Sequence, residues 1–378
     1  MKNQTVIHIS NYAAPYKGNF ISSLEKLEEK LEERLENSGN NRMIYIFPDQ
    51  CKNTNWIEKF VNTHKVYFVS SPGKKYKEIF GGGRSKLIQE LKKIFKEEKP
   101  SIIHCHFDGY DEYVVKANKV DAEIIWHEHN ERSLVKNPIK KIYQKINLRY
   151  QYGVIGKKVH IISLYNGFEK FLRRYGYKGN IEVIPNGIEE KRITFSPKVR
   201  GDSIKFLTFG GRVEDKGLDI LLKSIKILKK RTNCKFVIYI TEGKDTKECV
   251  NKIFEDDIPK EIDIIPQTEN VSGLFEKVDC FLAPSRRETF SYAVAEAMLS
   301  GTPAIISDLE AVSWAFSQKS IITFESENVD DLAEKIINYI ENNLSEQYLK
   351  DARKFVLESY TVSAWADKVI KYYDSILS

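Results

Sequence analysis

The sequence predicts an α/β protein made of two domains, each with a parallel β-sheet covered by helices. Three observations support this prediction. Short apolar runs rich in β-branched residues alternate with amphipathic stretches of helical spacing. The alternation restarts after Gly187, and 378 residues are enough for two hydrophobic cores. Since strands that alternate with helices form right-handed βαβ units, both domains are expected to be Rossmann-like.

The first domain is expected to cover residues 1–188 and the second residues 189–360, with a linker near 187–203. The helical candidates of the first domain include 20–36 and 85–98, whose apolar residues recur every three or four positions. Its strand candidates are 5–9, 42–47, 65–70, 101–106, 123–128, 159–164 and 181–184.

The second domain repeats the pattern, with helices of roughly 10–15 residues between its strands. Its strand candidates are 204–209, 235–240, 261–265, 279–283, 303–307 and 320–323. Three helices close the chain, at 328–342, 345–358 and 361–377. Because the last of them follows the final strand of the second sheet, we expect residues 361–378 to pack back on the first domain.

The composition is that of a globular protein. Hydrophobic residues make up 42% of the chain and charged residues 30%, which excludes a disordered protein. No stretch approaches the roughly 20 apolar residues that cross a bilayer, and the first residues run into a strand pattern instead of a signal peptide. We expect a cytoplasmic protein and leave open a place at the inner face of the membrane. The scattered cysteines fit reduced core residues better than disulfides or zinc: Cys51, Cys105, Cys234, Cys249 and Cys280.

Two strand ends of the second domain carry residues suited to a diphosphate. Ligands of open parallel sheets bind at the carboxyl ends of strands, and two such domains place the expected site in the cleft between them. "GGRVEDKG" (210–217) follows the first strand, and its glycines let the backbone approach a ligand. Arg212 and Lys216 then lie beside a helix start. An ordinary βα turn with surface basic residues is the alternative interpretation.

The stretch "ETFSYAVAEAMLSG", which begins at Glu288, places two acids around the start of an apolar helix. Eight residues at 100° each leave Glu288 and Glu296 about 80° out of register on one helix. If the helix begins near Phe290, Glu288 lies in the loop, and Glu296 lies two turns inside, half buried and in need of a partner. The first N–H groups, of Phe290, Ser291 and Tyr292, then form an anion site.

Four motifs together resemble the GT-B glycosyltransferases of family 4, which are retaining enzymes that use nucleotide-sugar donors. The motifs are "VIPNGI" (183–188), "GGRVEDKG" (210–217), "APSRRETFSYAVAEAM" (283–298) and "GTPAIISD" (301–308). The resemblance covers nearly the whole chain in order, and the second domain carries most of it. It implies two Rossmann-like domains that face each other across a cleft, the N-terminal one for the acceptor and the C-terminal one for the donor.

The resemblance also assigns donor-binding residues. Arg212 and Lys216 would hold the donor diphosphate and stabilise the leaving group. Glu288 would accept hydrogen bonds from hydroxyls of the transferred sugar, and Glu296 would bind the ribose. Arg212 and Lys216 are four residues apart where the family usually has five or more, which implies a tighter turn. The other donor-binding residues would be Gly211, Ile265, Gln267, Thr289, Phe290, Ser291 and Tyr292.

In the first domain the resemblance rests on a loop and on histidines. "NYAAPYKGNF" takes the place of the family's glycine-rich loop, with Gly18 as its single glycine for the donor phosphate. Four histidines lie at two strand ends, "IIHCHFDG" and "IIWHEHN". Since residues two apart in a strand share a face, His104/His106 and His127/His129 are expected to form pairs on adjacent strands.

These histidines have three interpretations. The resemblance places His129 at the reaction centre near the sugar's hydroxymethyl group, with His127 as the alternative, and it places His106 and Asp108 on the acceptor side. Hydrogen-bonded histidines that cap strands are a structural alternative, above all for His104. A zinc site is the third. We expect no metal, because no further ligand lies at the required spacing and the family needs no protein-bound metal.

Positive charge is concentrated in the first half of the chain. The formal net charge is +6, and residues 131–180 hold 12 basic and 2 acidic residues. This asymmetry suggests an anionic partner, with a lysine-rich solvated surface as the alternative. Within it, residues 136–158 are amphipathic. Family members with lipid-linked acceptors dock on anionic bilayers through such helices, and the alternative is a cleft-lining helix whose apolar face is core.

The sequence therefore predicts a retaining glycosyltransferase that moves a hexose or N-acetylhexosamine from a UDP-sugar to a hydroxyl group. The acceptor would be a saccharide or be linked to a lipid or protein, in bacterial surface polysaccharide, teichoic acid or glycoconjugate synthesis. The leaving phosphate would take the acceptor's proton. The two acids would thus touch different parts of one donor, unlike paired glycosidase carboxylates, which flank one bond. Neither a metal, another cofactor nor nucleic acid is expected.

Other functions fit fewer features. A nicotinamide dehydrogenase would need G-x-G-x-x-G after strand 5–9, and "GGGRSK" (81–86) lacks the spacing of a phosphate loop. A sugar phosphorylase or a UDP-sugar 2-epimerase-like enzyme on the same fold gives no reason for two acids eight residues apart. An anionic-ligand or nucleic-acid-binding protein would explain the charge of the first half but not the acidic second half.

Overall fold

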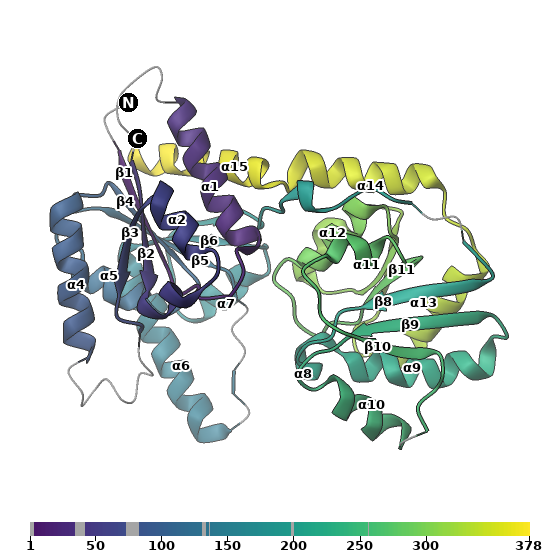
Figure 1. Cartoon of the computed structure of the whole chain (residues 1–378). Coiled ribbons are helices and arrows are strands. Elements are labelled where there is room, and N and C mark those ends of the chain that lie inside the picture. The colour runs from purple at the N-terminus through teal and green to yellow at the C-terminus, as the bar shows by residue number, and fades with distance from the viewer. Residues whose placement is uncertain are drawn as a thin grey trace. The chain divides into compact units, whose positions relative to one another are not determined.

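The computed structural model describes residues 4–34, 42–72, 83–130, 134–135, 137–197, 200–255 and 257–378, with only the backbone described for 83–85 (Figure 1). The chain forms two compact units. Unit 1 consists of Met1–Gly187 and Val362–Ser378, and unit 2 consists of Ile188–Thr361. Each unit has a parallel sheet with helices on its faces. The predicted α/β class with two Rossmann-like domains is therefore confirmed.

Unit 1 is built on a seven-stranded parallel sheet in the order β3-β2-β1-β4-β5-β6-β7. Several of its strands are buried along nearly their whole length, as expected of parallel strands that are covered on both faces. Because β1, β4 and β5 are neighbours, the residues at their carboxyl ends meet at one edge of the sheet. The strands are β1 Thr5–Ser10, β2 Arg42–Pro48, β3 Lys65–Val69, β4 Ile102–His106, β5 Glu123–Glu128, β6 His160–Ser163 and β7 Ile181–Val183.

Two hydrophobic clusters cover the faces of this sheet. One joins Val6 of the sheet to Leu24 and Val369, and the other joins Ile7 to Leu91. The first cluster brings together helices from the two ends of the chain. The helices of unit 1 are α1 Gly18–Glu33, η2 Asp49–Asn53, α2 Ile57–Thr63, α4 Gly83–Glu98, α5 Asp111–Ala117, α6 Pro138–Gly153, η3 Ile155–Lys158, α7 Phe168–Arg174 and α15 Val362–Leu377.

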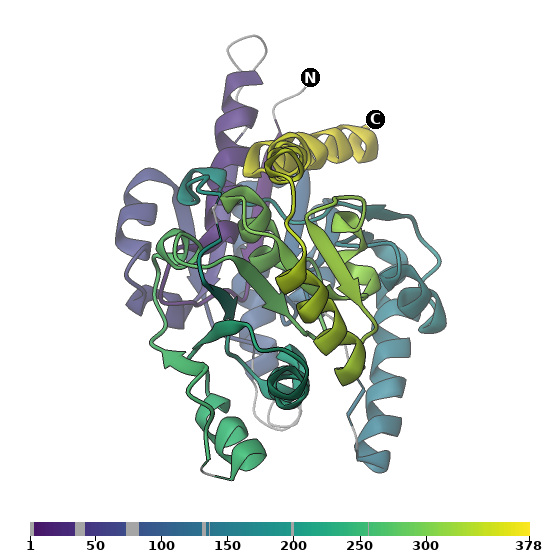
Figure 2. The ribbon, with the colours of Figure 1, turned by 90° about the vertical axis from the view of Figure 1, so that its right-hand side faces the viewer.

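The C-terminal helix α15 lies beside α1 in both views (Figures 1 and 2). Two ion pairs join these helices at the surface, Lys30 to Asp367 at 2.5 Å and Arg34 to Asp374 at 2.9 Å. The apolar side of α15 is buried in the cluster that also holds α1. The last helix of the chain is thus part of the core of unit 1.

Unit 2 has a six-stranded parallel sheet in the order β10-β9-β8-β11-β12-β13. Its strands are β8 Ser203–Thr208, β9 Lys235–Thr241, β10 Ile262–Ile265, β11 Cys280–Ala283, β12 Ala304–Ser307 and β13 Ile321–Phe324. Helices α9 and α13 contact each other and share a core around Phe206, Leu221 and Leu332. The helices are η4 Glu190–Arg192, α8 Val213–Lys216, α9 Leu218–Arg231, α10 Thr246–Phe254, α11 Val271–Phe275, α12 Tyr292–Ser300, η5 Glu310–Ala315, α13 Val329–Glu341 and α14 Glu346–Ser359.

The predicted elements agree closely with the observed ones. Each predicted strand lies within one residue of the observed strand at both ends. Helix α1 begins at Gly18, two residues before its predicted start. Four of the five cysteines are buried, but Cys234 is exposed just before β9, so its assignment to the core was wrong. Residues 81–82 of "GGGRSK" and Lys136 lie outside the described residues.

Within the described parts of the chain, none of the helices combines the length and the apolar character that a membrane span requires.

Candidate functional site

The first strand end of unit 2 is shaped by three glycines. A Cβ atom at Gly210 would lie 1.9 Å from the carbonyl oxygen of Thr241 at the end of β9. Gly217 has a φ of +65°, and its Cβ would lie 1.8 Å from the carbonyl oxygen of Pro284. At Gly211 a Cβ would come within 3.1 Å of Lys216 Cγ. Glycine therefore allows the turn after β8 to approach the loops after β9 and β11.

Short helix α8 carries the two predicted diphosphate ligands at its ends. Arg212 is its N-cap residue and Lys216 its last residue, and Lys216 N–H donates to the Arg212 carbonyl over 2.8 Å. One helical turn thus accommodates the four-residue spacing. The Arg212 side chain is 63% exposed and pairs with Asp215 at 3.1 Å and more distantly with Glu214.

The structure brings Lys216 and Glu288 together from two different strand ends. Lys216 Nζ donates to Glu288 Oε1 over 2.8 Å, and Ser285 Oγ donates to the same oxygen over 2.9 Å. Glu288 is 12% exposed and Lys216 is 41% exposed. The pair therefore lies at the surface of unit 2 with its cation accessible.

Two arginines that the sequence analysis did not single out fix the loop after β11. Arg286 forms a bidentate pair with Asp219 of α9, at 2.7 and 2.9 Å, and donates to the Val213 carbonyl over 3.1 Å. Burial alone would raise the pKa of Asp219, but the hydrogen bonds and charge of Arg286 outweigh it and hold that pKa below its usual value. Arg287 pairs with Asp215 at 3.1 Å. These contacts bind the loop that carries Glu288 to α8.

The helix behind Glu288 begins later than predicted. Helix α12 starts at Tyr292, and Ser291 precedes it with a φ of +66°. Thr289, Phe290 and Ser291 therefore belong to the loop, and the predicted start near Phe290 was two residues early because a left-handed residue interrupts the helical path. The first-turn N–H groups of the helix begin with Tyr292.

The loop before α12 is held by aromatic packing. Phe290 is buried, and its ring stacks on Trp314 with centroids 4.9 Å apart. Trp314 Nε1–H donates to the Phe290 carbonyl over 2.9 Å. Phe290 thus contributes its ring to the core, and Thr289 remains half-buried in the loop.

Glu296 lies on α12 in an apolar setting, as the sequence analysis expected. It follows Val294 and Ala295 and precedes Ala297, all of which are buried. Burial raises the pKa of Glu296 to about 7, and the charge of Arg192 opposes this only in part. Among the residues that the structure describes, none forms a hydrogen bond with this carboxyl group. Glu296 is therefore a half-buried acid whose pKa lies near neutral pH.

Two of the predicted donor-binding residues, Ile265 and Gln267, lie at and just after the end of β10. The Ile265 carbonyl accepts a hydrogen bond from Glu242 N–H over 2.8 Å, and Ile265 pairs with Thr241 in the sheet. Gln267 is exposed two residues later. The main chain of Ile265 is thus already engaged, and Gln267 is the accessible member of the two.

In unit 1, Gly18 is the first residue of α1 and has a φ of +62°. The loop before it is closed by Tyr12, whose hydroxyl lies 3.0 Å from the Tyr16 carbonyl and 3.1 Å from the Lys17 carbonyl. A Cβ atom at Gly18 would lie 2.8 Å from the Tyr12 hydroxyl oxygen. The single glycine therefore supports a left-handed turn into the helix.

The histidines of unit 1 form one buried cluster, and it is larger than predicted. His104 and His106 of β4 lie beside His127 and His129 of β5 and its end, as expected for adjacent strands. The fifth member, His8, pairs in register with His104 from β1. We call these five residues the histidine cluster. His8 was missed because it stands alone in its strand, and only the order of the sheet brings it to the others.

Burial keeps the histidine cluster uncharged. It lowers the pKa of His8 and of His129 to about 3, and at His129 a hydrogen bond to Asn186 opposes this effect only slightly. It also lowers the pKa of His104, His106 and His127 well below the ordinary value, and the neighbouring histidines add to this. The rings are neutral throughout the physiological range.

The predicted reaction-centre histidine has no ring nitrogen left for a substrate. His129 Nε2 lies 3.0 Å from His106 Nδ1, and His129 Nδ1 lies 3.1 Å from Asn186 Oδ1. His127 is equally buried. Asp108, by contrast, is half-buried in the turn after β4. At the ends of β4 and β5, the residues that are half-buried or exposed belong to the turns, Asp108 and Asn130 among them.

The basic helix α6 exposes its apolar face. The side chains that share this face are Ile139 at 79% exposure, Ile142 at 62%, Tyr143 at 37%, Ile146 at 60% and Tyr150 at 46%. The alternative in which these residues form core is therefore wrong, and only the end of the helix is buried. In both views α6 extends away from the sheet of unit 1 (Figures 1 and 2).

Both units match models of glycosyltransferase domains. Residues 189–356 match "Glycosyl transferases group 1", and residues 52–192 match "Glycosyltransferase Family 4". A glycosyltransferase of Haemophilus influenzae is 24% identical over 178 residues, which are 45% of this chain and 48% of that protein. The match thus spans about half the length of this relative.

Solved structures show the same fold over the whole chain. A glycosyltransferase from Rickettsia africae has a TM-score of 0.78 at 15% identity and covers 100% of this chain and 99% of its own. The Anabaena protein HepE, in complex with UDP and glucose, has a TM-score of 0.73 at 12% identity and covers 99% of this chain and 100% of its own. With the two parallel sheets and the two matched models, this chain belongs to the family-4-type glycosyltransferases of the GT-B fold.

Proposed function

We propose that the protein transfers a hexosyl or N-acetylhexosaminyl group from a UDP-sugar to a hydroxyl acceptor with retention of configuration. The observation that carries this proposal is the contact of Lys216 with Glu288 in unit 2, just before the helix that holds Glu296. An accessible cation, a held carboxylate and a half-buried acid without a hydrogen-bond partner among the described residues would meet the diphosphate, sugar and ribose of one donor. The complex of HepE with UDP and glucose supports UDP as the nucleotide.

Diphosphate binding would rearrange the ion pairs of α8. Lys216 Nζ is bound to Glu288, and Arg212 is bound to Asp215. Since phosphate oxygens compete with carboxylates for these cations, the donor would draw Lys216 and Arg212 toward itself. The departing phosphate gains negative charge in the transition state, so both cations would lower the barrier. Glu288, still held by Ser285, would then accept hydrogen bonds from the sugar hydroxyls.

Glu296 would bind the ribose as a carboxylate. A carboxylate accepts hydrogen bonds from two adjacent hydroxyl groups, whereas its protonated form must donate one. Because burial raises its pKa to about 7, binding at neutral pH would release part of a proton. The ribose would supply the hydrogen-bond partners that this half-buried acid lacks among the described residues.

The acceptor's proton would leave with the phosphate. The retained configuration needs no carboxylate nucleophile in this scheme, and it assigns no role to a metal ion or to another cofactor. The ring of His129 is neutral with both nitrogens bonded, so we assign it no acid–base step. Its main chain and Asp108 would contact the acceptor side.

The exposed face of α6 would dock on an anionic bilayer. Apolar side chains lie along one side at helical spacing, and the described basic residues of the helix are Lys140, Lys141, Lys145 and Arg149, with no acidic residue from 138 to 153. This pattern is typical of helices that lie in the membrane interface. A lipid-linked acceptor in surface polysaccharide, teichoic acid or glycoconjugate synthesis would then lie in the same membrane to which the enzyme is bound.

Vesicle binding tests this part of the proposal. The protein is expected to sediment with vesicles that contain phosphatidylglycerol and to stay in solution with pure phosphatidylcholine. The double variant Ile142→Asp, Ile146→Asp should lose the binding, and Leu357→Asp, on the exposed side of α14, serves as the matched control. Equal sedimentation of both variants would contradict the docking face.

A nucleotide screen tests the donor. We expect UDP and one or more UDP-sugars to raise the melting temperature, and the stabilising sugar donor to be hydrolysed slowly without acceptor. NMR of the product released with an acceptor should show the donor's anomeric configuration. If no nucleotide shifts the melting temperature, the proposed function fails.

A further inference from the structure

The histidine cluster forms one unbranched chain of hydrogen bonds together with Tyr373 of α15 and Asn186. The links in order are His127 Nδ1 to His104 Nε2 (3.2 Å), His104 Nδ1 to the Tyr373 hydroxyl (2.6 Å), that hydroxyl to His8 Nε2 (3.3 Å), His8 Nδ1 to His106 Nε2 (2.9 Å), His106 Nδ1 to His129 Nε2 (3.0 Å), and His129 Nδ1 to Asn186 Oδ1 (3.1 Å). The chain runs from His127 near the end of β5, through Tyr373 of α15, to Asn186, which lies next to the end of the first segment of unit 1.

The chemistry of imidazole gives this chain a direction. A neutral ring has one N–H donor and one acceptor nitrogen. Because Asn186 Oδ1 can only accept, His129 donates from Nδ1, and its Nε2 accepts from His106 Nδ1. The same step applied to each ring in turn leaves every ring of the cluster protonated on Nδ1. It also makes the Tyr373 hydroxyl donate to His8 and accept from His104.

The far end of the chain is compatible with this direction. His127 Nε2 is buried and has no partner at full hydrogen-bond geometry. In the inferred direction this atom is a bare acceptor. In the reverse direction, with the Asn186 amide turned over, it would carry an N–H beside the main chain of Ile184, which opposes slightly the lowering of the His127 pKa. The inferred direction therefore rests on Asn186 Oδ1, which faces His129 Nδ1.

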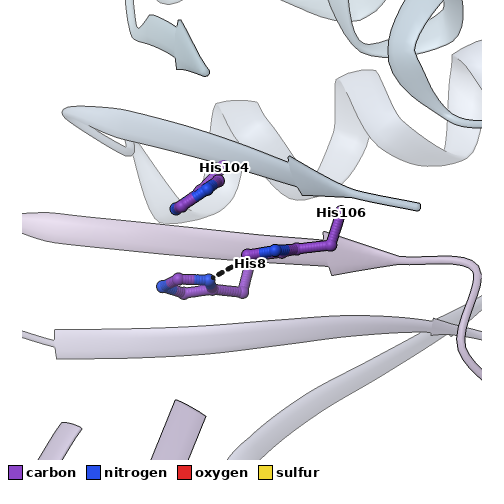
Figure 3. Close-up of side chains that lie close together, drawn as sticks. All are labelled: His8, His104 and His106. Atoms are coloured by element: carbon purple, nitrogen blue, oxygen red, sulfur yellow. Dashed lines mark hydrogen bonds between the residues drawn. The ribbon is translucent and has the colours of Figure 1, made fainter. Parts of the chain in front are cut away.

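A metal site is the competing interpretation of the cluster. The ligand atoms of His8, His104 and His106 lie within 4.8 Å of one another, as do those of His106, His127 and His129 (Figure 3). However, the rings of His104 and His106 are stacked with centroids 4.1 Å apart at 26°, and those of His127 and His129 are stacked at 4.0 Å and 24°. Rings that bind one ion radiate from it in a tetrahedral arrangement. The stacked rings therefore favour hydrogen bonds.

We propose that the histidine cluster and Tyr373 form a one-directional hydrogen-bond chain of Nδ1–H tautomers, in which His8, His106 and Tyr373 are positioning residues for the contact between His129 and Asn186. That contact joins the end of β5 to the residues just before the boundary of unit 1. The expected effect of these positioning residues on sugar transfer rests on the proposed function, in which the main chain at His129 contacts the acceptor. The tautomers themselves do not depend on it.

The tautomers are directly observable. Histidine in water prefers the Nε2–H form, so five Nδ1–H rings are a distinctive state. Long-range ¹H–¹⁵N correlation spectra of the ¹⁵N-histidine-labelled protein should show five rings as Nδ1–H that do not titrate between pH 6 and 8. His64 and His160 lie outside the cluster and serve as references in the same spectrum. Nε2–H rings in the cluster would overturn the proposal, and so would stoichiometric binding of added Co²⁺ with ligand-field bands.

Substitution tests the positioning role. Tyr373→Phe removes the hydroxyl that joins His8 to His104, and we expect His104 to change tautomer. The kcat for transfer to the acceptor should fall about tenfold, which is less than the roughly 100-fold that a 1 Å misplacement at a reaction centre can cause. The donor KM should stay unchanged. For His8, Gln can donate and accept through its amide and should retain more activity than Leu. His160→Gln, outside the cluster, should match the wild type.

The outcomes separate the two proposals. If no sugar is transferred but the five Nδ1–H signals are present, the proposed function fails and the chain stands. If transfer is normal in Tyr373→Phe while the tautomers change as expected, the chain exists but positions nothing, and the positioning role is overturned. If Tyr373→Phe unfolds, the wild-type spectrum and His8→Gln still decide.

Discussion

The two units carry polar groups at their strand ends in opposite ways. In unit 2, Lys216 and Glu288 form an ion pair whose cation is accessible, and the loop beneath it is fixed by Arg286. In unit 1, five histidines are buried, neutral and bonded to one another or to Tyr373 and Asn186. One site can exchange its internal partners for a ligand's charge, whereas the other has nearly all its hydrogen-bonding capacity used internally.

This difference separates binding from positioning. Ion pairs at a surface contribute little stability because water and salt compete with them, so a diphosphate can replace them at low cost. Buried hydrogen-bond networks are costly to leave incomplete, so they hold geometry instead. Histidines at strand ends are therefore no evidence for acid–base chemistry by themselves. Such a role also requires that the ring nitrogens be accessible to the substrate.

Acid should separate the two regions most strongly. Burial lowers the pKa of His8 and His129 from 6.5 to about 3, so between pH 6.5 and 3 these two histidines are protonated in the unfolded chain but neutral in the folded protein. The free energy of unfolding is therefore highest above pH 6.5, the pKa of an unfolded histidine. It decreases as the pH falls below that value, by about 1.4 kcal/mol per pH unit for each of the two histidines. The urea midpoint should change little between pH 7.5 and 6.5 and fall steeply between pH 6.5 and 5.5. A flat profile would mean that the cluster is not neutral.

Removing the accessible cation of unit 2, Lys216, should abolish most of the transferase activity of the protein. For Lys216→Ala we expect kcat/KM to fall by about 10²–10³, the usual effect of losing one stabilising group at a developing charge. Folding should be unaffected, because the side chain is 41% exposed. Lys350→Ala, which breaks a surface pair on α14, is the matched control. A loss below fivefold would count against the diphosphate role of Lys216.

The half-buried Glu296 of unit 2 should give the stability a pH dependence opposite to that of the histidines. Because the pKa of Glu296 is raised from 4.5 to about 7, the folded state holds the proton longer, and the stability falls as pH rises from 4.5 to 7. Glu296→Gln should therefore be more stable than the wild type above pH 7, by roughly 3 kcal/mol, and equal to it below pH 4.5. It should also weaken UDP binding. Equal pH profiles would contradict the raised pKa.

The smallest expected effect concerns Arg212. Its side chain is 63% exposed and already paired with Asp215, so it is the more mobile of the two cations. Arg212→Ala should lower kcat/KM by about 10-fold, less than Lys216→Ala. Steady-state assays with saturating acceptor measure the ratio. A larger loss than for Lys216→Ala would reverse the assignment of the two cations.

The strands were predictable because each is a short apolar run that a parallel sheet buries on both faces. The proximity of Lys216 and Glu288 was implied by motifs at two strand ends, since such ends meet at one edge, but the ion pair between them was not predicted. Other features depend on backbone conformations or on contacts between distant residues, which local sequence patterns do not predict. Ser291 adopts a left-handed φ of +66° that no helical period predicts, and it delays the start of α12. The place of His8 follows from the neighbourhood of β1 and β4.

The exposed face of α6 shows the same limit. Its apolar spacing fits a helix packed on a core as well as one that faces outward, and only the exposure of Ile139 and Ile142 decides. Likewise, Arg286 and Arg287 look alike in sequence, but one is bonded to Asp219 and the other to Asp215. Periodicity predicts which side of an element is apolar and not what covers it.

The central claim is that Lys216, Glu288 and Glu296 form a nucleoside-diphosphate site in unit 2. Calorimetric titration of the whole protein with UDP tests it most directly. The wild type should bind one UDP per chain, more tightly at pH 8 than at pH 6 because Glu296 ionises near 7. Lys216→Ala and Glu296→Gln should each weaken binding at least tenfold, while Lys350→Ala does not. Unchanged UDP affinity in both site variants would contradict the account.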